Sequence, residues 1–177
     1  ESNEIYSWGH NRVGQLGISP EKNKIKNDTD SGLTIIPIPT KIKQSLDKNL
    51  NIMQIACGWG HTIILYENGS VWTFGRNFRG QLGIDQNECF ENEITHYMHI
   101  PTEILFFRDK KIIHVFAGGE YSGAVSDNGD IYMWGDNSFQ NIPILGKNVK
   151  WTIYPTKINI SKPLLISSGF KSTIFLH

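Results

Sequence analysis

Short runs of hydrophobic residues, rich in β-branched and aromatic side chains, recur along the chain and predict strands. In TIILYENGSVWTF (62–74), two such runs flank Asn68-Gly69, a pair that favours a tight hairpin because glycine accepts positive φ. Asn128-Gly129 stands between two further runs of the same kind. No longer segment has apolar residues at the 3.6-residue spacing of a helix. The pattern therefore predicts an all-β fold of short antiparallel strands.

In three predicted strands, aromatic side chains occupy alternate positions. Successive side chains of a strand point to opposite sides, so residues two apart share a face. The pairs are Tyr6 with Trp8, Trp72 with Phe74, and Tyr132 with Trp134. Large aromatic side chains are mostly buried in folded domains. We therefore expect these pairs to lie in the core.

The same order of segments occurs three times along the chain. A strand ending in Trp/Phe-Gly-x-Asn comes first, then a segment reading IPTKI, IPTEI or YPTKI, and then a strand pair such as IACGWGHTIIL. Four short strands in each unit are typical of a β-propeller blade. We expect about three blades of four antiparallel strands, which together form one partial β-propeller domain. The repeats are 1–66, 67–126 and 127–177.

The composition excludes several classes of protein. Of the 177 residues, 17 are basic and 17 acidic, so no net field draws the chain to nucleic acid or an anionic membrane. Cys57 and Cys89 cannot build a disulfide framework, and no apolar run is long enough to span a bilayer. We expect an intracellular protein of the nucleus or cytoplasm, without a membrane partner. Because Glu1 falls inside a strand-like pattern, we interpret the chain as a piece of a larger protein.

The repeated segments resemble those of the regulator of chromosome condensation family. The matching features are the Trp/Phe-Gly-x-Asn segment, Gly-Gln-Leu-Gly at 14–17 and 80–83, the Pro-Thr-x-Ile segment, and Gly-x-x-His at 58–61. The third repeat lacks Gly-Gln-Leu-Gly, and Tyr121 and Ser172 stand where the repeat histidine would be. The resemblance implies a propeller, which has seven blades in the family.

The resemblance also implies two functions. The first is a protein-interaction module that acts as a scaffold or recognition surface through its blade loops. The alternative is guanine-nucleotide exchange on a small GTPase of the Ran type, with catalysis by differential binding. Chromatin is a third partner, which the balanced charge disfavours.

The repeats differ most in the short loop inside each Gly-x-x-His segment and its counterparts. Loops at one end of a propeller carry binding because a rigid scaffold presents them. In exchange factors of the family, acidic and histidine side chains of this loop approach the GTPase, so the resemblance favours Glu120 and His61. The His61 ring has an alternative structural interpretation, in which it hydrogen-bonds the backbone. The partner-binding candidates are Trp59, His61, Glu120, Tyr121, Phe170 and Lys171.

Sequence motifs for covalent chemistry are missing. The chain has no nucleophile elbow, no phosphate-binding glycine loop and no motif that pairs carboxylates, so we expect no catalytic residue and no cofactor. Whether the full-length protein catalyses exchange stays open.

Two insertions stand out, 19–36 and 85–99. The first is polar, and we expect it to be solvated; the second is more apolar, and we expect it to fold against a blade edge or bind a partner. The second also holds side chains that could gather zinc, but their spacing fits no established ligand pattern, so we expect no metal. These residues are Glu88, Cys89, Glu91, Glu93, His96 and His99.

Three blades cannot close a ring of seven, so strand edges and apolar blade faces require a cover. The simplest cover is the rest of a longer protein. The alternative is a head-to-tail homodimer, in which the strand STIFLH (172–177) of one copy begins the blade that EIYSWG (4–9) of the other continues.

Overall fold

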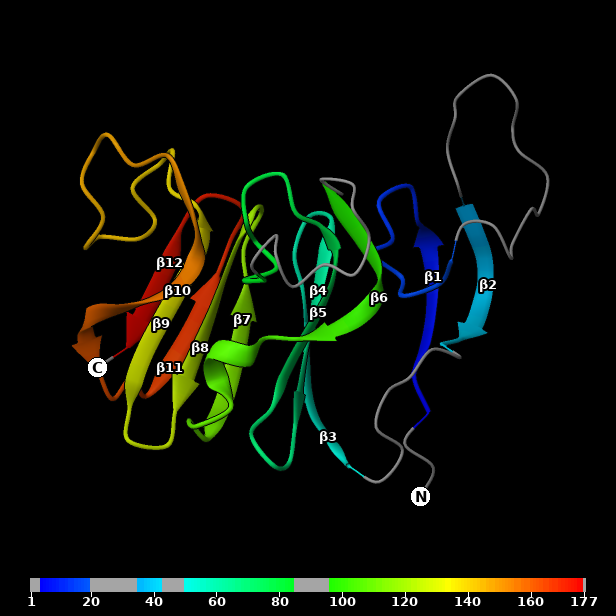
Figure 1. Cartoon of the computed structure of the whole chain (residues 1–177), viewed down its shortest axis with the longest axis horizontal. Helices are drawn as coiled ribbons and strands as arrows, with labels where there is room; N and C mark the ends of the chain where they lie inside the picture. Colours follow the sequence, from blue (N-terminus) through cyan, green and yellow to red (C-terminus); the bar gives the residue numbers. More distant parts are fainter. Residues whose placement is uncertain (1–3, 20–34, 43–49, 85–95, 177) are drawn as a thin grey trace.

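The computed structural model describes residues 4–19, 35–42, 50–84 and 96–176, and strands dominate these ranges (Figure 1). The strands are β1 (Tyr6–His10), β2 (Ile35–Lys41), β3 (Ile52–Cys57), β4 (His61–Tyr66), β5 (Val71–Arg76), β6 (Tyr97–Glu103), β7 (Ile112–Ala117), β8 (Tyr121–Ser126), β9 (Asp130–Asp136), β10 (Trp151–Ser161), β11 (Leu165–Ser168) and β12 (Thr173–Leu176). A 3-10 turn, η3 (Leu105–Phe107), lies between β6 and β7. Among the described residues, no helix has the length and apolar character needed to cross a membrane.

Two sheets have four antiparallel strands each, in the orders β3-β4-β5-β6 and β7-β8-β9-β10. They confirm the predicted four-stranded antiparallel blade. The remaining strands form two-stranded sheets, β1-β2 and β11-β12. Figure 1 shows β1-β2 at one end, then the β3-β6 sheet and then the β7-β10 sheet, which β11-β12 overlaps in this view.

The sequence repeats and the sheets are out of phase. Tyr66 ends β4 and Val71 begins β5, and both strands belong to one sheet, so the boundary between 1–66 and 67–126 falls inside a blade. The boundary after Ser126 falls inside the next blade in the same way. By alignment, β1-β2 corresponds to the last two strands of a blade, and β11-β12 corresponds to the first two.

The hairpins predicted at the Asn-Gly pairs are present. Gly69 N–H donates to the Tyr66 carbonyl at 2.9 Å, and Tyr66 N–H donates to the Ser70 carbonyl at 3.0 Å. Only the glycine takes positive φ, +86° at Gly69, while the Asn68 side chain accepts from the Ser70 N–H. The β4-β5 turn therefore uses glycine for its backbone and asparagine for its side-chain oxygen.

The largest core cluster lies between the two four-stranded sheets. Trp134, fully buried, packs in this cluster with Leu82 and Phe107. The prediction that every aromatic pair is buried is wrong for the first one: Tyr6 is 50% and Trp8 58% exposed. Trp134 is covered by Gln81 and Phe107 of the preceding repeat. The described residues contain no repeat before β1 that would cover Trp8 in the same way.

Candidate functional site

The loops between β3 and β4, β7 and β8, and β11 and β12 lie at one end of the sheets, together with the segments that follow β1, β5 and β9. We call this end the loop face; it lies at the top of Figure 1. Two backbone hydrogen bonds link equivalent residues of successive repeats. Trp59 N–H donates to the Gly119 carbonyl at 3.0 Å, and Gly119 N–H donates to the Phe170 carbonyl at 3.0 Å. The three loops are therefore joined directly to one another.

Gly119 makes this close approach of loops sterically allowed. A Cβ atom at Gly119 would lie 2.5 Å from the Phe170 carbonyl oxygen and 2.8 Å from its ring. Without that atom, the Trp59 ring reaches across and meets the Phe170 ring edge-on, with centroids 6.1 Å apart. The equivalent residues of the three loops are thus Trp59, Gly119 and Phe170. The glycine in the middle lets the two aromatic rings meet.

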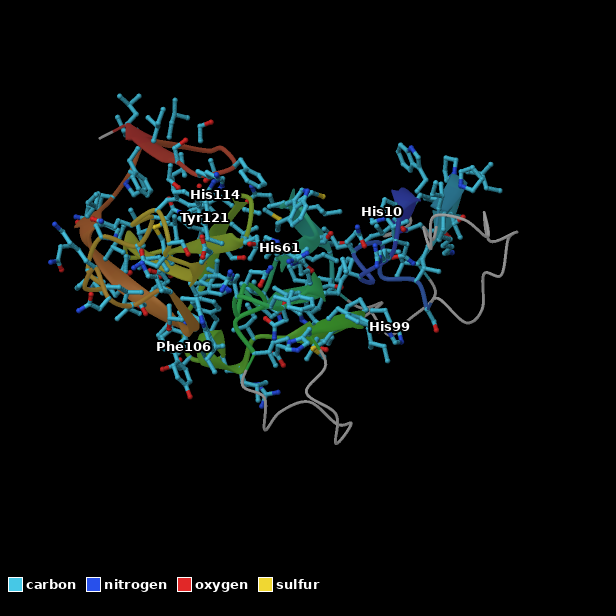
Figure 2. The ribbon with its side chains drawn as sticks, turned by 90° about the horizontal axis from the view of Figure 1, so that it is seen from above. His10, His61, His99, Phe106, His114 and Tyr121 are labelled. Atoms are coloured by element: carbon cyan, nitrogen blue, oxygen red, sulfur yellow. The ribbon has the colours of Figure 1, made fainter. Side chains whose placement is uncertain are left out.

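The repeat histidine has a structural role. His61 is 1% exposed, and its Nε2 lies 2.9 Å from the Ser122 hydroxyl, which donates to the Gln81 carbonyl at 2.7 Å. Figure 2 shows His61 within the row of sheets, well separated from His10 beside β1. Burial lowers the pKa of His61 to about 4, against a raising effect of the backbone at Tyr121. The ring is therefore neutral at physiological pH.

Tyr121 makes the equivalent link to the next repeat. It is fully buried, and its hydroxyl donates to the Ser172 carbonyl at 2.6 Å and lies 2.7 Å from the Thr173 Oγ1. Thr173 aligns with Ser122, so both links run from this position to a hydroxyl of the next repeat. Neither His61 nor Tyr121 offers a surface to a partner in this structure.

Arg76, at the end of β5, is held from three sides. Its Nε lies 2.9 Å from the Glu120 Oε1 in an ion pair between the two four-stranded sheets. Its guanidinium carbon lies 4.8 Å from the Trp59 ring centroid and 4.6 Å from that of Phe78. Glu120 therefore positions an arginine, and the two rings fix the place of its guanidinium.

The contacts continue in both directions and form a row that we call the aromatic–cation ladder. Beyond Phe78, the His96 ring stacks at 4.3 Å. Beyond Phe170, the Lys171 ammonium lies 5.7 Å from its ring and 4.2 Å from that of Phe139. The ladder consists of His96, Phe78, Arg76, Trp59, Phe170, Lys171 and Phe139.

The six sequence candidates thus fall into three groups. Trp59, Phe170 and Lys171 are exposed on the loop face, Glu120 is half-buried against Arg76, and His61 and Tyr121 are buried, as described above. Whether a partner binds any of them stays a prediction.

Sequence reasoning missed three members of the ladder, Arg76, Phe78 and Phe139. All three follow the Trp/Phe-Gly pair of a repeat, at positions where the repeats differ in residue type. The presence of an aromatic residue in an otherwise polar loop could have indicated Phe78 and Phe139 from the sequence.

The zinc alternative falls mostly on residues outside the described ranges, namely Glu88, Cys89, Glu91 and Glu93. Of the remaining two side chains, His96 stacks on Phe78, and His99 lies on β6. Across 4–19, 35–42, 50–84 and 96–176, no three His, Cys, Asp or Glu side chains come together as metal ligands would. Most of both insertions, 20–34 and 85–95, also lies outside these ranges.

Comparison with known proteins assigns the sequence of this chain to a family. The profile described as "Regulator of chromosome condensation (RCC1) repeat" matches residues 2–65 and 68–125, which is more than half of the chain. The chain belongs to the RCC1 repeat family. A second profile of the same repeat matches residues 52–81, the segment that holds Trp59, His61 and Arg76.

Members of the RCC1 family with similar sequences are longer than this chain. The human X-linked retinitis pigmentosa GTPase regulator is 31% identical over 163 residues, which cover 92% of this chain and 14% of that protein. The mitochondrial RCC1 domain-containing protein RUG3 of Arabidopsis thaliana is 32% identical over 133 residues, covering 75% of this chain and 25% of that protein.

A solved structure supports the propeller architecture. Prp20p of Saccharomyces cerevisiae, whose crystal structure was described with its binding to Gsp1p and histones, superimposes with a TM-score of 0.80 at 26% identity. The match covers 97% of this chain and 39% of Prp20p. The present chain therefore has the fold of part of an RCC1 propeller.

Proposed function

We propose that this chain is a protein-interaction module that recognises its partner through the loop face. The observation that carries the proposal is the aromatic–cation ladder. Trp59 is 59% and Phe170 56% exposed, yet both belong to loops that hydrogen-bond one another. Tryptophan and arginine are enriched among residues that dominate binding energy at protein interfaces, and a rigid loop loses little entropy when it binds.

The remaining chemistry of the loop face supports recognition without covalent catalysis. His61, the buried histidine of the repeat, is hydrogen-bonded to Ser122, and Glu120 forms an ion pair with Arg76. The exposed groups are rings and cations, which suit a protein surface of complementary shape and charge.

The test is affinity capture with the full-length protein that contains this chain. The double variant Trp59→Ala/Phe170→Ala removes the centre of the ladder. Phe106→Ala is the matched control, because Phe106 is a 40% exposed aromatic in η3, on the β6-β7 connection at the opposite end of the sheets. We expect the double variant to lose specific partners that the control retains. Equal recovery by both variants would overturn the proposal.

The second candidate is guanine-nucleotide exchange on a small GTPase of the Ran type. Its support is the similarity to Prp20p and the family resemblance, in which Glu120 and His61 are the matching residue types. The test is release of labelled nucleotide from such a GTPase in the presence of the full-length protein. Acceleration of release that is lost in Glu120→Ala supports exchange, and unchanged release removes it.

A chromatin partner remains the less favoured proposal, because 17 basic and 17 acidic residues give the chain no net charge. An intracellular location in the nucleus or cytoplasm also stays a proposal. Imaging of the full-length protein tests the location, and binding to nucleosomes at physiological salt tests chromatin.

The two-stranded sheets support a head-to-tail homodimer as a further proposal. β11-β12 corresponds to the first two strands of a blade and β1-β2 to the last two, so a second copy would complete a four-stranded sheet. Trp8 and Ile174, which such a sheet would bring under cover, are 58% and 70% exposed. Light scattering at micromolar concentration tests it: a dimeric mass supports the pairing, and a monomeric mass overturns it.

A further inference from the structure

A pocket of about 430 Å³ opens on the loop face between the β1-β2 sheet and the β3-β6 sheet. One wall comes from the segment after β1, and the other comes from the β3-β4 loop and the end of β5. Its lining combines cationic side chains with aromatic rings. The residues that carry the argument are Arg12, Trp59, Arg76 and Phe78.

The guanidinium of Arg76 is held in an orientation that suits the binding of an oxyanion. The Glu120 Oε1 lies 2.9 Å from its Nε as an ion pair without hydrogen-bond geometry, and the rings of Trp59 and Phe78 lie close to the guanidinium carbon. Among the described residues, no hydrogen bond from the two terminal nitrogens of Arg76 is found. A guanidinium held in this way retains the end-on fork that matches the two oxygens of a carboxylate.

The charge of the pocket matches a single negative group. Arg12 and Arg76 contribute two positive charges, and Glu120 beside the pocket contributes one negative charge. Among the described residues, Arg12 has no ion-pair partner and no carboxylate lines the pocket. One positive charge is thus left for a ligand to neutralise, which suits a carboxylate better than a doubly charged phosphate.

The rings determine what can flank that carboxylate. Trp59 is 59% and Phe78 45% exposed, and both line the pocket. The exposed parts of these two rings would cover an apolar side chain next to the acid. Free inorganic anions lack such a group and would leave this apolar surface in water.

We propose that the pocket binds the carboxylate of a glutamate or aspartate in a segment of a protein partner, next to an apolar side chain. Arg76 takes the carboxylate through its two terminal nitrogens, and Arg12 adds positive charge from the facing wall. Glu120 acts as a positioning residue for Arg76. This inference deepens the proposed function and rests on the loop face being a recognition surface.

The test uses the full-length protein and a fluorescent peptide with one glutamate between two leucines. Matched peptides carry glutamine or phosphoserine in place of the glutamate. Arg76→Lys keeps the charge and loses the fork, and Arg12→Ala removes charge from the other wall. Arg79→Lys is the control, since Arg79 is an exposed arginine of the same loop that does not line the pocket.

We expect the glutamate peptide to bind about tenfold or more tightly than the glutamine peptide. Arg76→Lys and Arg12→Ala weaken that binding, Arg79→Lys leaves it unchanged, and added salt weakens it. Equal affinity for glutamate and glutamine, no binding at all, or an unchanged affinity in Arg76→Lys would each overturn the inference. Tighter binding of the phosphoserine peptide would overturn its assignment to a carboxylate.

This outcome is separable from the broader proposal. If peptides fail to bind while Trp59→Ala/Phe170→Ala still loses partners in affinity capture, the loop face is a recognition surface without the acidic specificity. If the double variant retains its partners as well, both proposals fall together.

Discussion

The imidazole Nε2 of His61 lies 2.9 Å from the hydroxyl of Ser122. One repeat later, the Tyr121 hydroxyl lies 2.7 Å from the Oγ1 of Thr173, which aligns with Ser122. The Ser122 hydroxyl donates to the carbonyl of Gln81 at 2.7 Å, so a strand of one blade is joined to a strand and a loop of its neighbour. The repeat histidine thereby contributes to the packing of blades. The recognition surface consists of other residues.

Removing the Ser122 hydroxyl should loosen the junction between the two blades. Ser122→Ala leaves the His61 Nε2 without its partner in a buried site, and the Gln81 carbonyl keeps only the Trp134 indole N–H at 3.0 Å. We expect the free energy of unfolding to fall by about 1–3 kcal/mol. Urea denaturation followed by tryptophan fluorescence measures it. Ser167→Ala, at an exposed position of β11, serves as control; an equal loss in both variants contradicts the prediction.

Acid should weaken the fold through His61. Its pKa is lowered from 6.5 to about 4 in the folded chain, so the unfolded chain takes up a proton first as the pH falls. The contribution of His61 to stability is therefore fully present above pH 6.5 and is lost as the pH falls towards 4. Between these values the free energy of unfolding decreases by up to about 1.4 kcal/mol per pH unit.

Comparison with His61→Gln isolates this contribution. His114, whose pKa burial also lowers, contributes in the same direction in both proteins. Denaturation midpoints measured from pH 7 to pH 4.5 should fall more steeply for the unaltered chain. Parallel pH profiles would show that His61 does not titrate as described.

A methyl group at Gly118 should disrupt the loop face. A Cβ at this position would lie 2.0 Å from the Tyr121 ring, whose hydroxyl links the next repeat. We expect Gly118→Ala to destabilise the chain by about 1–3 kcal/mol, because the ring must shift in a packed site. Gly146→Ala is the matched control, since nothing lies within 4 Å of its added Cβ. Similar thermal midpoints for the two variants would contradict the steric account.

The fold could be predicted from the sequence because its signals are local. Asn68-Gly69 lies between β-forming runs, and a hairpin needs only those residues. Burial was less predictable, because Trp8 and Trp134 occupy equivalent positions in equivalent segments but differ in exposure from 58% to 0%. What differs is the cover that Trp134 receives from Gln81 and Phe107 of the preceding repeat, which the sequence of the segment itself does not contain.

The site was harder to predict, because its contacts join repeats. Trp59 and Phe170 were recognised as candidates, but the sequence could not show that their rings meet over Gly119. His61 and Glu120 were selected by residue type, whereas the structure gives each a fixed partner within the chain. Such pairings depend on how neighbouring sheets are positioned relative to one another.

The central claim is that a protein partner docks on the aromatic–cation ladder. Its most direct test places a photo-crosslinking amino acid at Trp59 of the full-length protein, and in a second protein at Phe106 on the opposite end of the sheets. Irradiation in cells, followed by mass spectrometry, measures which proteins become attached. The account predicts a discrete protein adduct from position 59 and none from position 106. Equal adducts from both positions, or an adduct from position 106 alone, would contradict it.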